Sequence, residues 1–344
     1  MKLTPLGNTG IQVPSIVFGT SALGNLFTAL KPSEKEAIVK ESIRYTQPQT
    51  FFDSAGKYGA GLALESLGNA LNALDVPKDQ VVVSNKLGWV RTPLVGDEPQ
   101  FEKGVWRDLK HDAVQKISYD GILECFEEGN ELLQGYSTQL ASVHDPDEYL
   151  AKATTAEEEK ALFEDILEAY RALEDLKKKG LVKGIGVGAK DWKVIPRIYE
   201  HIKLDWVMFA NSMTIISHPK ELLQFMKKLS DDGVGILNSA VFQSGFLVGG
   251  DYYDYQLIKP DSPENKARFE WRERFFALCK EFEIPPAHAC VQFGLSAPGV
   301  ACVALSTSEP AKVKRNVEAT EKALPAEFWA EMHNRGLLKE YSPL

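Results

Sequence analysis

The sequence predicts an α/β protein folded as a (β/α)8 barrel, the TIM-barrel architecture, with an N-terminal β-hairpin and long βα loops. The chain has 344 residues, a length that suits one large α/β barrel. Short apolar runs alternate with amphipathic runs, as in parallel strands joined by right-handed helical crossovers. Because no low-complexity linker or change in charge divides the chain, we expect residues 1–344 to form a single domain.

Eight apolar runs are expected to form the strands. Most of them are followed by a helix-like stretch, as βα units require. Eight such units suggest a closed barrel rather than an open sheet. The expected strands lie at residues 16–19, 49–53, 81–86, 139–143, 182–187, 205–210, 234–239 and 300–305.

The amphipathic runs predict helices, and two of them carry local end signals. Ser33 fits the N-cap of a capping box in which the side chain of Glu36 reaches back. Three lysines at 177–179 precede Gly180, which suits the last turn and the left-handed cap of a helix. The expected helices lie at residues 33–46, 62–74, 119–135, 157–179, 191–201, 219–232, 286–297 and 310–322.

A β-hairpin is expected ahead of the barrel. Residues 3–6 and 11–13 flank the turn sequence Gly-Asn-Thr-Gly at 7–10. We expect this hairpin to plug the N-terminal face of the barrel.

Two long segments follow strand ends, where barrel enzymes place their active-site loops. They are residues 90–118 and residues 240–284, and the second contains an aromatic and polar stretch at 249–255. We expect lids or substrate walls here, with plain surface loops as the alternative.

The composition limits the classes of partner. A formal net charge of −9 argues against nucleic acid or an anionic membrane. Cys125, Cys279, Cys290 and Cys302 form no C-x-x-C pair, and no histidine cluster has metal-ligand spacing. We therefore expect reduced thiols, no metal and a small-molecule partner. With no secretory signal and no membrane-spanning run in the sequence, a cytoplasmic location is expected.

Four polar residues lie at or just past consecutive expected strand ends. Asp53 ends the second strand, Tyr58 follows in the next loop, Lys86 ends the third strand and His144 follows the fourth. The carboxyl ends of barrel strands meet at one mouth, so these side chains are expected to converge. Any one of them alone is more often structural than catalytic, but the combination points to catalysis.

The combination suits hydride transfer at a carbonyl carbon, which requires a proton donor or acceptor at the oxygen. A phenol such as Tyr58 ionises near pH 10 and needs a neighbouring cation to ionise more easily. Lys86 can supply that charge, and Asp53 can hold Lys86 in place. His144 can orient the substrate oxygen or share the proton.

The order Asp-x4-Tyr, then Lys, then His resembles the tetrad of the aldo-keto reductase family. Further matches cover nearly the whole chain, at residues 6–10, 18–20, 59, 65–68 and 305–316. Residues 143–147 and 244–252 resemble the sugar dehydrogenases of that family, which act on L-fucose, D-threo-aldoses and galactose. That resemblance implies oxidation of an L-fucose-like aldose at C1 to its lactone by NAD or NADP, with Tyr58 as the base. The alternatives are an NADPH-dependent reductase of aldehydes, pyridoxal-like ones included, and a cofactor-sensing regulatory protein.

The resemblance also implies where the cofactor binds. Ser306 favours NAD, whereas Lys312 and Arg315 lie near the expected 2′-phosphate position and leave NADP open. The sequence departs from many members at Gly188-Ala189-Lys190, at Asn238 and at Gly56-Lys57. The implied cofactor contacts are Gly19, Thr20, Asp53, Gly188, Asn238, Ser239, Phe242, Gly245, Leu247, Ser306, Thr307, Lys312, Arg315 and Asn316.

Two tryptophans follow strand ends and are candidates for the substrate pocket, beside Tyr58 and His144. Trp89 and Trp192 can stack on the apolar face of a sugar ring, or they pack as ordinary core or loop residues. Residues 184–189 match the dinucleotide-binding pattern G-x-G-x-x-A, but these glycines lie within a strand rather than in the turn after it, so no Rossmann site is expected.

Overall fold

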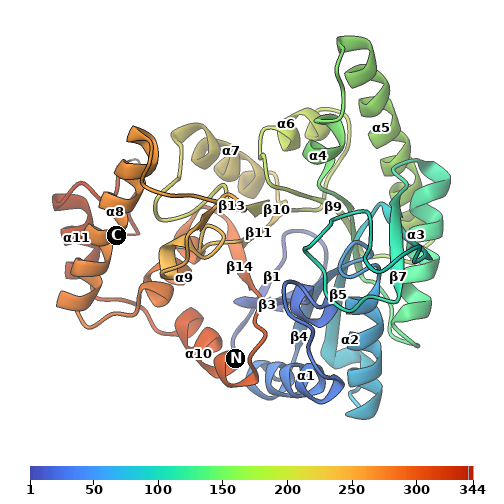
Figure 1. The fold of residues 1–344 in the computed structure, drawn as a ribbon, viewed down its shortest axis with the longest axis horizontal. Coiled ribbons are helices and arrows are strands. Elements are labelled where there is room, and N and C mark those ends of the chain that lie inside the picture. Colours follow the sequence, from blue (N-terminus) through green and yellow to red (C-terminus); the bar gives the residue numbers. More distant parts are fainter. Residues whose placement is uncertain (340, 344) are drawn as a thin grey trace.

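Eight parallel strands close into a barrel in the computed structural model, which describes residues 1–339 and 341–343 (Figure 1). Each strand pairs with the barrel strands that precede and follow it in the sequence, and the last pairs with the first. The barrel strands are β3 (Ile16–Gly19), β4 (Thr50–Ala55), β5 (Val81–Leu87), β8 (Leu140–His144), β9 (Gly184–Ala189), β10 (Trp206–Ala210), β11 (Gly235–Ser239) and β14 (Val300–Leu305). The structure confirms the predicted fold class and all eight predicted strands.

The eight expected helices are present and lie outside the strands (Figure 1). The helix expected at 191–201 is shorter than predicted. These helices are α1 (Pro32–Thr46), α2 (Leu62–Ala73), α3 (Tyr119–Leu132), α5 (Ala156–Lys178), α6 (Val194–Tyr199), α7 (Lys220–Asp231), α9 (Pro286–Ser296) and α10 (Pro310–Glu321).

The two predicted helix ends have different outcomes. The prediction that Ser33 caps α1 is wrong, because the N-cap is Lys31 and the first helical residue is Pro32. Proline suits that position because it has no N–H to lose and its φ angle is already helical. The Lys31 N–H donates to the Glu34 carboxylate at 2.8 Å. At the end of α5, Gly180 adopts φ +72° as predicted.

Among the residues that the structure describes, three further α-helices were not predicted: α4 (Pro146–Leu150), α8 (Pro263–Glu281) and α11 (Ala326–Asn334). The last two lie together beside α9 (Figure 1). The aromatic side chains of α8 pack in several directions rather than along one stripe. Trp271 stacks on Phe275, for example, while Phe269 contacts Phe246 of the preceding loop. This leaves no clear helical periodicity in the sequence.

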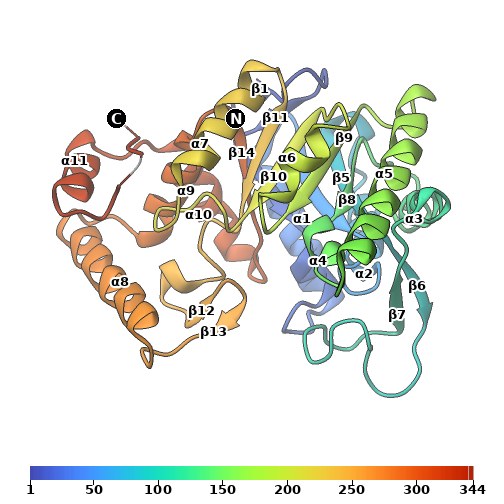
Figure 2. The same cartoon turned by 90° about the horizontal axis from the view of Figure 1, so that it is seen from above.

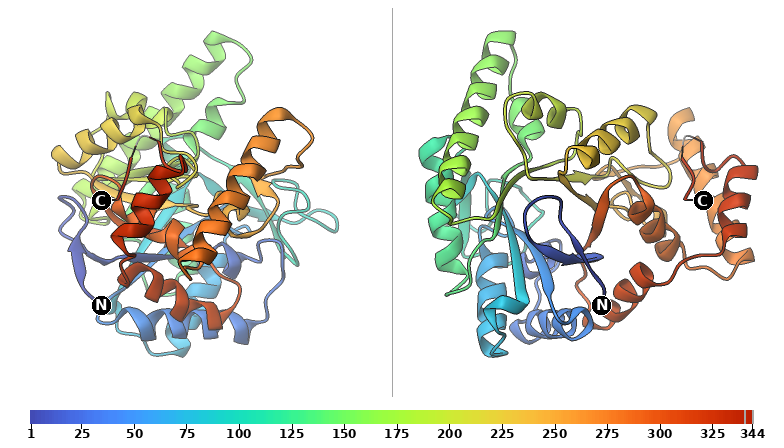
Figure 3. Two further views of the ribbon diagram at one scale, coloured as in Figure 1. Left: turned by 90° about the vertical axis from the view of Figure 1, so that its left-hand side faces the viewer. Right: turned by 180° about the vertical axis from the view of Figure 1, so that it is seen from behind.

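The predicted hairpin closes the N-terminal end of the barrel (Figure 3). Strand β1 (Leu3–Pro5) pairs antiparallel with β2 (Gln12–Pro14). The side chain of Leu6 is fully buried in a cluster that includes Phe51 and Trp206, which lie near the starts of barrel strands. The approach is close, because a Cβ on residue 7 would lie 2.3 Å from the Gly235 nitrogen.

Both long βα segments contain a small hairpin on the side of the barrel opposite β1 (Figure 2). The first hairpin pairs β6 (Trp89–Pro93) with β7 (His111–Gln115). The second pairs β12 (Tyr252–Tyr253) with β13 (Gln256–Leu257). They therefore build up the walls around the C-terminal mouth.

The structure also bears on the composition arguments. All four cysteines are buried and unpaired. No group of three or more His, Cys, Asp or Glu side chains in the described part of the chain is placed to hold a metal ion. None of the helices formed by the described residues has the length and apolar character needed to cross a bilayer.

The plug generates a stability prediction. Leu6→Ala leaves a cavity in a fully buried site, so we expect the free energy of unfolding to fall by about 2–5 kcal/mol. Urea denaturation followed by circular dichroism measures it. The matched control is Leu257→Ala, whose residue is 61% exposed and whose loss is expected to change stability by about 0.5 kcal/mol or less. Equal effects of the two substitutions would contradict a plugging role.

Candidate active site

The register of the barrel strands turns three polar side chains to one face of the sheet. Lys86 of β5 pairs with Ala55, which lies two residues after Asp53 on β4. His144 lies two residues after Ser142, the partner of Lys86 on β8. Residues two apart on a strand share a face. Asp53, Lys86 and His144 are all buried, and they line the inside of the barrel at its C-terminal mouth.

A buried ion pair joins the first two of these residues. The Lys86 ammonium donates to one oxygen of the Asp53 carboxylate, and the Ser84 hydroxyl donates to the other at 2.7 Å. Both charged side chains are about 5% exposed or less. Burial alone would lower the pKa of Lys86, but Asp53 and then Tyr58 outweigh it and raise that pKa. Lys86 is therefore a fixed cation.

Tyr58 is brought to this cation by the loop after β4. The Lys86 ammonium lies 4.9 Å from the centre of the Tyr58 ring. A glycine at position 24 allows the loop to sit this deep, because a Cβ there would lie 2.8 Å from the Tyr58 carbonyl. Burial raises the pKa of the Tyr58 phenol, and Lys86 opposes that rise without cancelling it. The phenol is thus protonated in the free protein at neutral pH.

His144 completes the group. Its ring meets the Tyr58 ring edge-on, with the ring centres 5.6 Å apart. Burial lowers the pKa of His144 well below its usual value, and the charges of Lys86, Lys57 and Lys190 lower it further. The imidazole is therefore neutral, so it can hydrogen-bond a substrate oxygen without holding the proton. The structure thus brings all four predicted tetrad residues together.

Several predicted cofactor residues lie along the ends of three neighbouring strands. Gly19 ends β3, Ser239 ends β11 and Ser306 follows β14, which pairs with both. The Ser306 hydroxyl lies 3.1 Å from that of Ser21 and is exposed. Thr20 follows Gly19 but is buried, where its hydroxyl contacts Ser54 and the Asp53 carbonyl.

Two of the predicted cofactor residues are cations on α10, the helix that follows β14. Lys312 and Arg315 are exposed on the first half of α10, where Lys312 pairs with the carboxylate of Glu309, the N-cap residue of that helix. The backbone N–H groups at a helix start and nearby cations can together receive a phosphate. The donor set therefore fits the phosphates of a nicotinamide dinucleotide. Thr307 and Asn316 are half-buried beside it.

The remaining cofactor candidates have other surroundings. The Asn238 amide is fully buried and donates to the carbonyls of Met213 and Gly294, so it supports the barrel wall. Leu247 is also fully buried, in a short 3-10 turn (Phe246–Val248). Gly188 packs on Lys86: a Cβ there would lie 3.2 Å from the Lys86 Cδ. Phe242 and Gly245 are half-buried in the loop after β11.

The two candidate tryptophans have different surroundings in the structure. Trp89 belongs to an aromatic wall, formed with Phe101 and Trp106, that packs against Tyr58; the Tyr58 and Trp106 ring centres are 6.0 Å apart. Sequence reasoning missed Phe101 and Trp106, which lie deep in the loop between β6 and β7. Trp192 instead packs on Phe225 of α7, with ring centres 6.2 Å apart, and contributes to the core.

This fold and tetrad agree with what the comparisons show. The sequence model of the Aldo/keto reductase family matches residues 15–335, so the chain belongs to that family. It is an enzyme, an oxidoreductase of a family that uses nicotinamide cofactors. The family resemblance that we inferred from the sequence is confirmed.

The chain resembles named relatives and solved structures over nearly its whole length. Pyridoxal 4-dehydrogenase of Microbacterium luteolum is 28% identical over 97% of both chains. D-threo-aldose 1-dehydrogenase of a Pseudomonas species is 27% identical over 96% of both. Among solved structures, aldo-keto reductase AKR11C1 of Bacillus halodurans matches with a TM-score of 0.72 and 21% identity, over 99% of this chain and 97% of its own.

The buried ion pair generates a prediction independent of catalysis. Lys86→Met leaves the Asp53 carboxylate buried and unpaired, which we expect to cost about 3–5 kcal/mol of unfolding free energy. Adding Asp53→Asn removes that orphaned charge, so the double variant is expected to be more stable than Lys86→Met alone. Urea denaturation of the four proteins in this cycle gives the coupling. Strictly additive effects would show that the pair contributes nothing as a unit.

Proposed function

We propose that this enzyme oxidises an L-fucose-like aldose at C1 to its lactone and transfers the hydride to a nicotinamide cofactor. The observation that carries the proposal is the buried Lys86–Asp53 pair beside Tyr58 and the neutral His144. Support for the direction comes from relatives named as dehydrogenases, one of them an aldose 1-dehydrogenase.

The proposed roles follow from the chemistry of each group. The nicotinamide, when bound, supplies the hydride acceptor. Tyr58 takes the proton from the C1 hydroxyl, and the Lys86 ammonium stabilises the phenolate that this requires. Asp53 keeps Lys86 charged and in place. His144, held neutral, hydrogen-bonds the reacting oxygen and orients it toward Tyr58.

We propose NAD as the preferred cofactor, because Ser306 occupies the exposed position at the end of β14. This chain resembles family members that lack a lysine at this position, and that resemblance supports NAD. Lys312 and Arg315 lie on α10, the helix that follows β14, and binding of a 2′-phosphate by these two cations, with a preference for NADP, is the competing outcome. The four unpaired cysteines suit the reducing cytoplasm that we propose as the setting.

A second candidate is the reduction of a flat aldehyde such as a pyridoxal-like ring. The aromatic wall of Trp89, Phe101 and Trp106 favours it, since such rings stack on planar substrates. The same wall also suits the apolar face of a sugar.

The first assay separates these candidates. Purified protein is mixed with NAD or NADP and a panel of aldoses that includes L-fucose and D-arabinose, at mildly alkaline pH. We expect the absorption band of the reduced nicotinamide to grow, faster with NAD. Loss of that band when aldehydes and reduced cofactor are supplied, with no growth on any aldose, would instead establish a reductase.

Replacing the proposed base tests the mechanism. Tyr58→Phe removes the proton-transfer group, so we expect kcat to fall by about 10²–10⁴-fold while cofactor affinity, followed by tryptophan fluorescence, stays the same. Tyr45→Phe on α1 is the matched control and is expected to keep full activity. A near-normal rate in Tyr58→Phe would falsify the assignment.

The protonation of Tyr58 also predicts the pH dependence. Its pKa is raised by burial, so at neutral pH only a small fraction is ionised. That fraction grows about tenfold per pH unit below the pKa, and kcat/KM for oxidation is expected to rise at up to that rate between about pH 7 and 9. Lys86→Met should move the rise to higher pH. A profile that is flat over this range would exclude a phenol as the base.

A further inference from the structure

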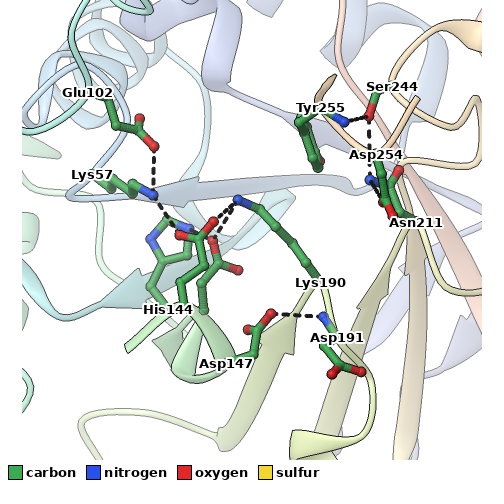
Figure 4. Close-up of polar contacts among 12 residues, drawn as sticks. Lys57, Glu102, His144, Asp147, Lys190, Asp191, Asn211, Ser244, Asp254 and Tyr255 are labelled. Atoms are coloured by element: carbon green, nitrogen blue, oxygen red, sulfur yellow. Dashed lines mark hydrogen bonds and ion pairs between the residues drawn. The ribbon is translucent and has the colours of Figure 1, made fainter. Parts of the chain in front are cut away.

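Five charged side chains form a cluster next to His144, and Figure 4 labels three of them, Lys57, Glu102 and Lys190. They come from four βα segments. Lys57 follows β4, Glu102 lies between β6 and β7, Asp145 and Glu148 follow β8, and Lys190 follows β9. None of them was among the predicted site residues.

These side chains form a connected set of ion pairs. The Lys57 ammonium lies 2.8 Å from Glu102 and 3.1 Å from Glu148. The Lys190 ammonium contacts Glu148 as well, and lies 3.6 Å from the Asp145 carboxylate. That Asp145 carboxylate is 3.5 Å from the Nε2 atom of His144. The set is therefore in direct reach of the tetrad.

Exposure divides the set into an inner and an outer part. The side chain of Lys57 is 7% exposed, whereas those of Lys190 and Glu148 are 31% and 42% exposed. Lys57 has two carboxylate partners and stacks over Trp89, so its position is fixed. Lys190 and Glu148 remain accessible to a ligand entering the mouth.

Tyr255 adds a ring to the outer part. Its ring centre lies 4.9 Å from the Lys190 ammonium. Asp254 and Tyr255 both adopt left-handed backbone conformations, at φ +52° and +63°, which are unfavourable for residues with a side chain. Within the described part of the chain, no hydrogen bond is made by the Tyr255 hydroxyl.

The left-handed pair is held in place by side chains from elsewhere on the mouth. The Ser244 hydroxyl accepts from the Tyr255 N–H at 2.9 Å. The Asn211 amide donates to the Asp254 carboxylate at 3.1 Å (Figure 4). Such strain persists only where the surroundings impose it, and it gathers at functional sites.

The charge balance decides what this surface can bind. Lys57 and Lys190 are matched by Glu102 and Glu148, and Asp145 adds negative rather than positive charge as it ionises. Burial raises the pKa of Asp145 to about 6, with Lys190 opposing that rise. Within this set of five side chains, no positive charge is left over for a phosphate or a carboxylate. A neutral hydroxyl pair fits instead, because one hydroxyl donates to a carboxylate while the next accepts from an ammonium.

We propose that Lys190, Glu148 and Tyr255 form a subsite for neighbouring hydroxyls of a neutral, unphosphorylated polyhydroxylated substrate. Lys190 donates to one hydroxyl, Glu148 accepts from the next, and the Tyr255 ring packs on the C–H face between them. This places the reacting carbon at Tyr58 and His144. The inference deepens the proposed aldose oxidation and rests on it for the identity of the substrate.

The test compares substrates that differ by a single hydroxyl. Wild-type enzyme is expected to lose about tenfold or more in kcat/KM when the aldose lacks a hydroxyl that contacts a charged side chain. In Lys190→Met, kcat/KM for the aldose and for one of its deoxy analogues should differ by less than about twofold. The main reason is that KM for the aldose rises. Glu148→Gln should reduce the discrimination at a neighbouring hydroxyl.

Two controls separate recognition from general damage. Lys183→Met, at the exposed start of the β9 segment, should keep the wild-type discrimination. Reduction of propanal, which has no hydroxyl, should lose much less in kcat/KM in Lys190→Met than oxidation of the aldose does, because only the aldose contacts the subsite. If the variant loses propanal activity to the same degree as aldose activity, or keeps full discrimination against every deoxy analogue, the subsite is wrong.

Failure of the subsite can be told from failure of the proposed function. If wild-type enzyme oxidises no aldose, the proposed function fails, and the subsite is then tested by reduction of glyceraldehyde against propanal. A preference for glyceraldehyde that Lys190→Met abolishes would support the subsite. Equal KM values in the wild type, or a preference for glyceraldehyde 3-phosphate over glyceraldehyde, would overturn it.

Discussion

The ion pair between Lys86 and Asp53 is the interaction on which the rest of the site depends. Two charges this deeply buried are stable only when paired and hydrogen-bonded, and Ser84 supplies the additional bond. The pair is carried by adjacent barrel strands, β4 and β5, whose register fixes the distance between them. A cation is thereby held inside the barrel, where little solvent is present to screen its charge.

The fixed cation gives the neighbouring groups their properties. Tyr58 is buried, which disfavours its ionised form, and Lys86 is the group that moves the phenol back toward ionisation. The same charge helps to keep His144 neutral. Two groups that exchange protons with water in isolation thus have distinct, opposite tasks within one cluster. One carries the proton, and the other only directs the oxygen.

Catalytic and recognition residues are placed by different parts of the fold. The four tetrad residues lie at strand ends and in one short loop, where the closed barrel allows little movement. The surfaces that face the substrate belong instead to the long βα segments, including the aromatic wall and the set of ion pairs around Lys190. Loops are less constrained than strands, which explains how a common barrel supports many substrates.

The sequence alone predicted the barrel and the tetrad because both are local. An apolar run identifies a strand wherever it occurs, and a polar residue at its end belongs to the mouth through topology alone. The hairpin plug was predicted for the same reason. The predicted N-cap of α1 was wrong because Pro32 and Ser33 are both acceptable at a helix start. The contact between Lys31 and Glu34 places the start of the helix at Pro32.

What only the tertiary structure decided involves residues far apart in the chain. Trp106, Glu102, Lys190 and Tyr255 come from different loops, and nothing in the local sequence of any of them shows that they share one mouth. Packing decided the surroundings of Asn238, which the family resemblance implied as a cofactor contact and which donates into the barrel wall, and of Trp192, which packs on Phe225 of α7. Strand patterns repeat every two residues and can be read locally, whereas the path of a long loop depends on the free energy of contacts with the whole assembled barrel.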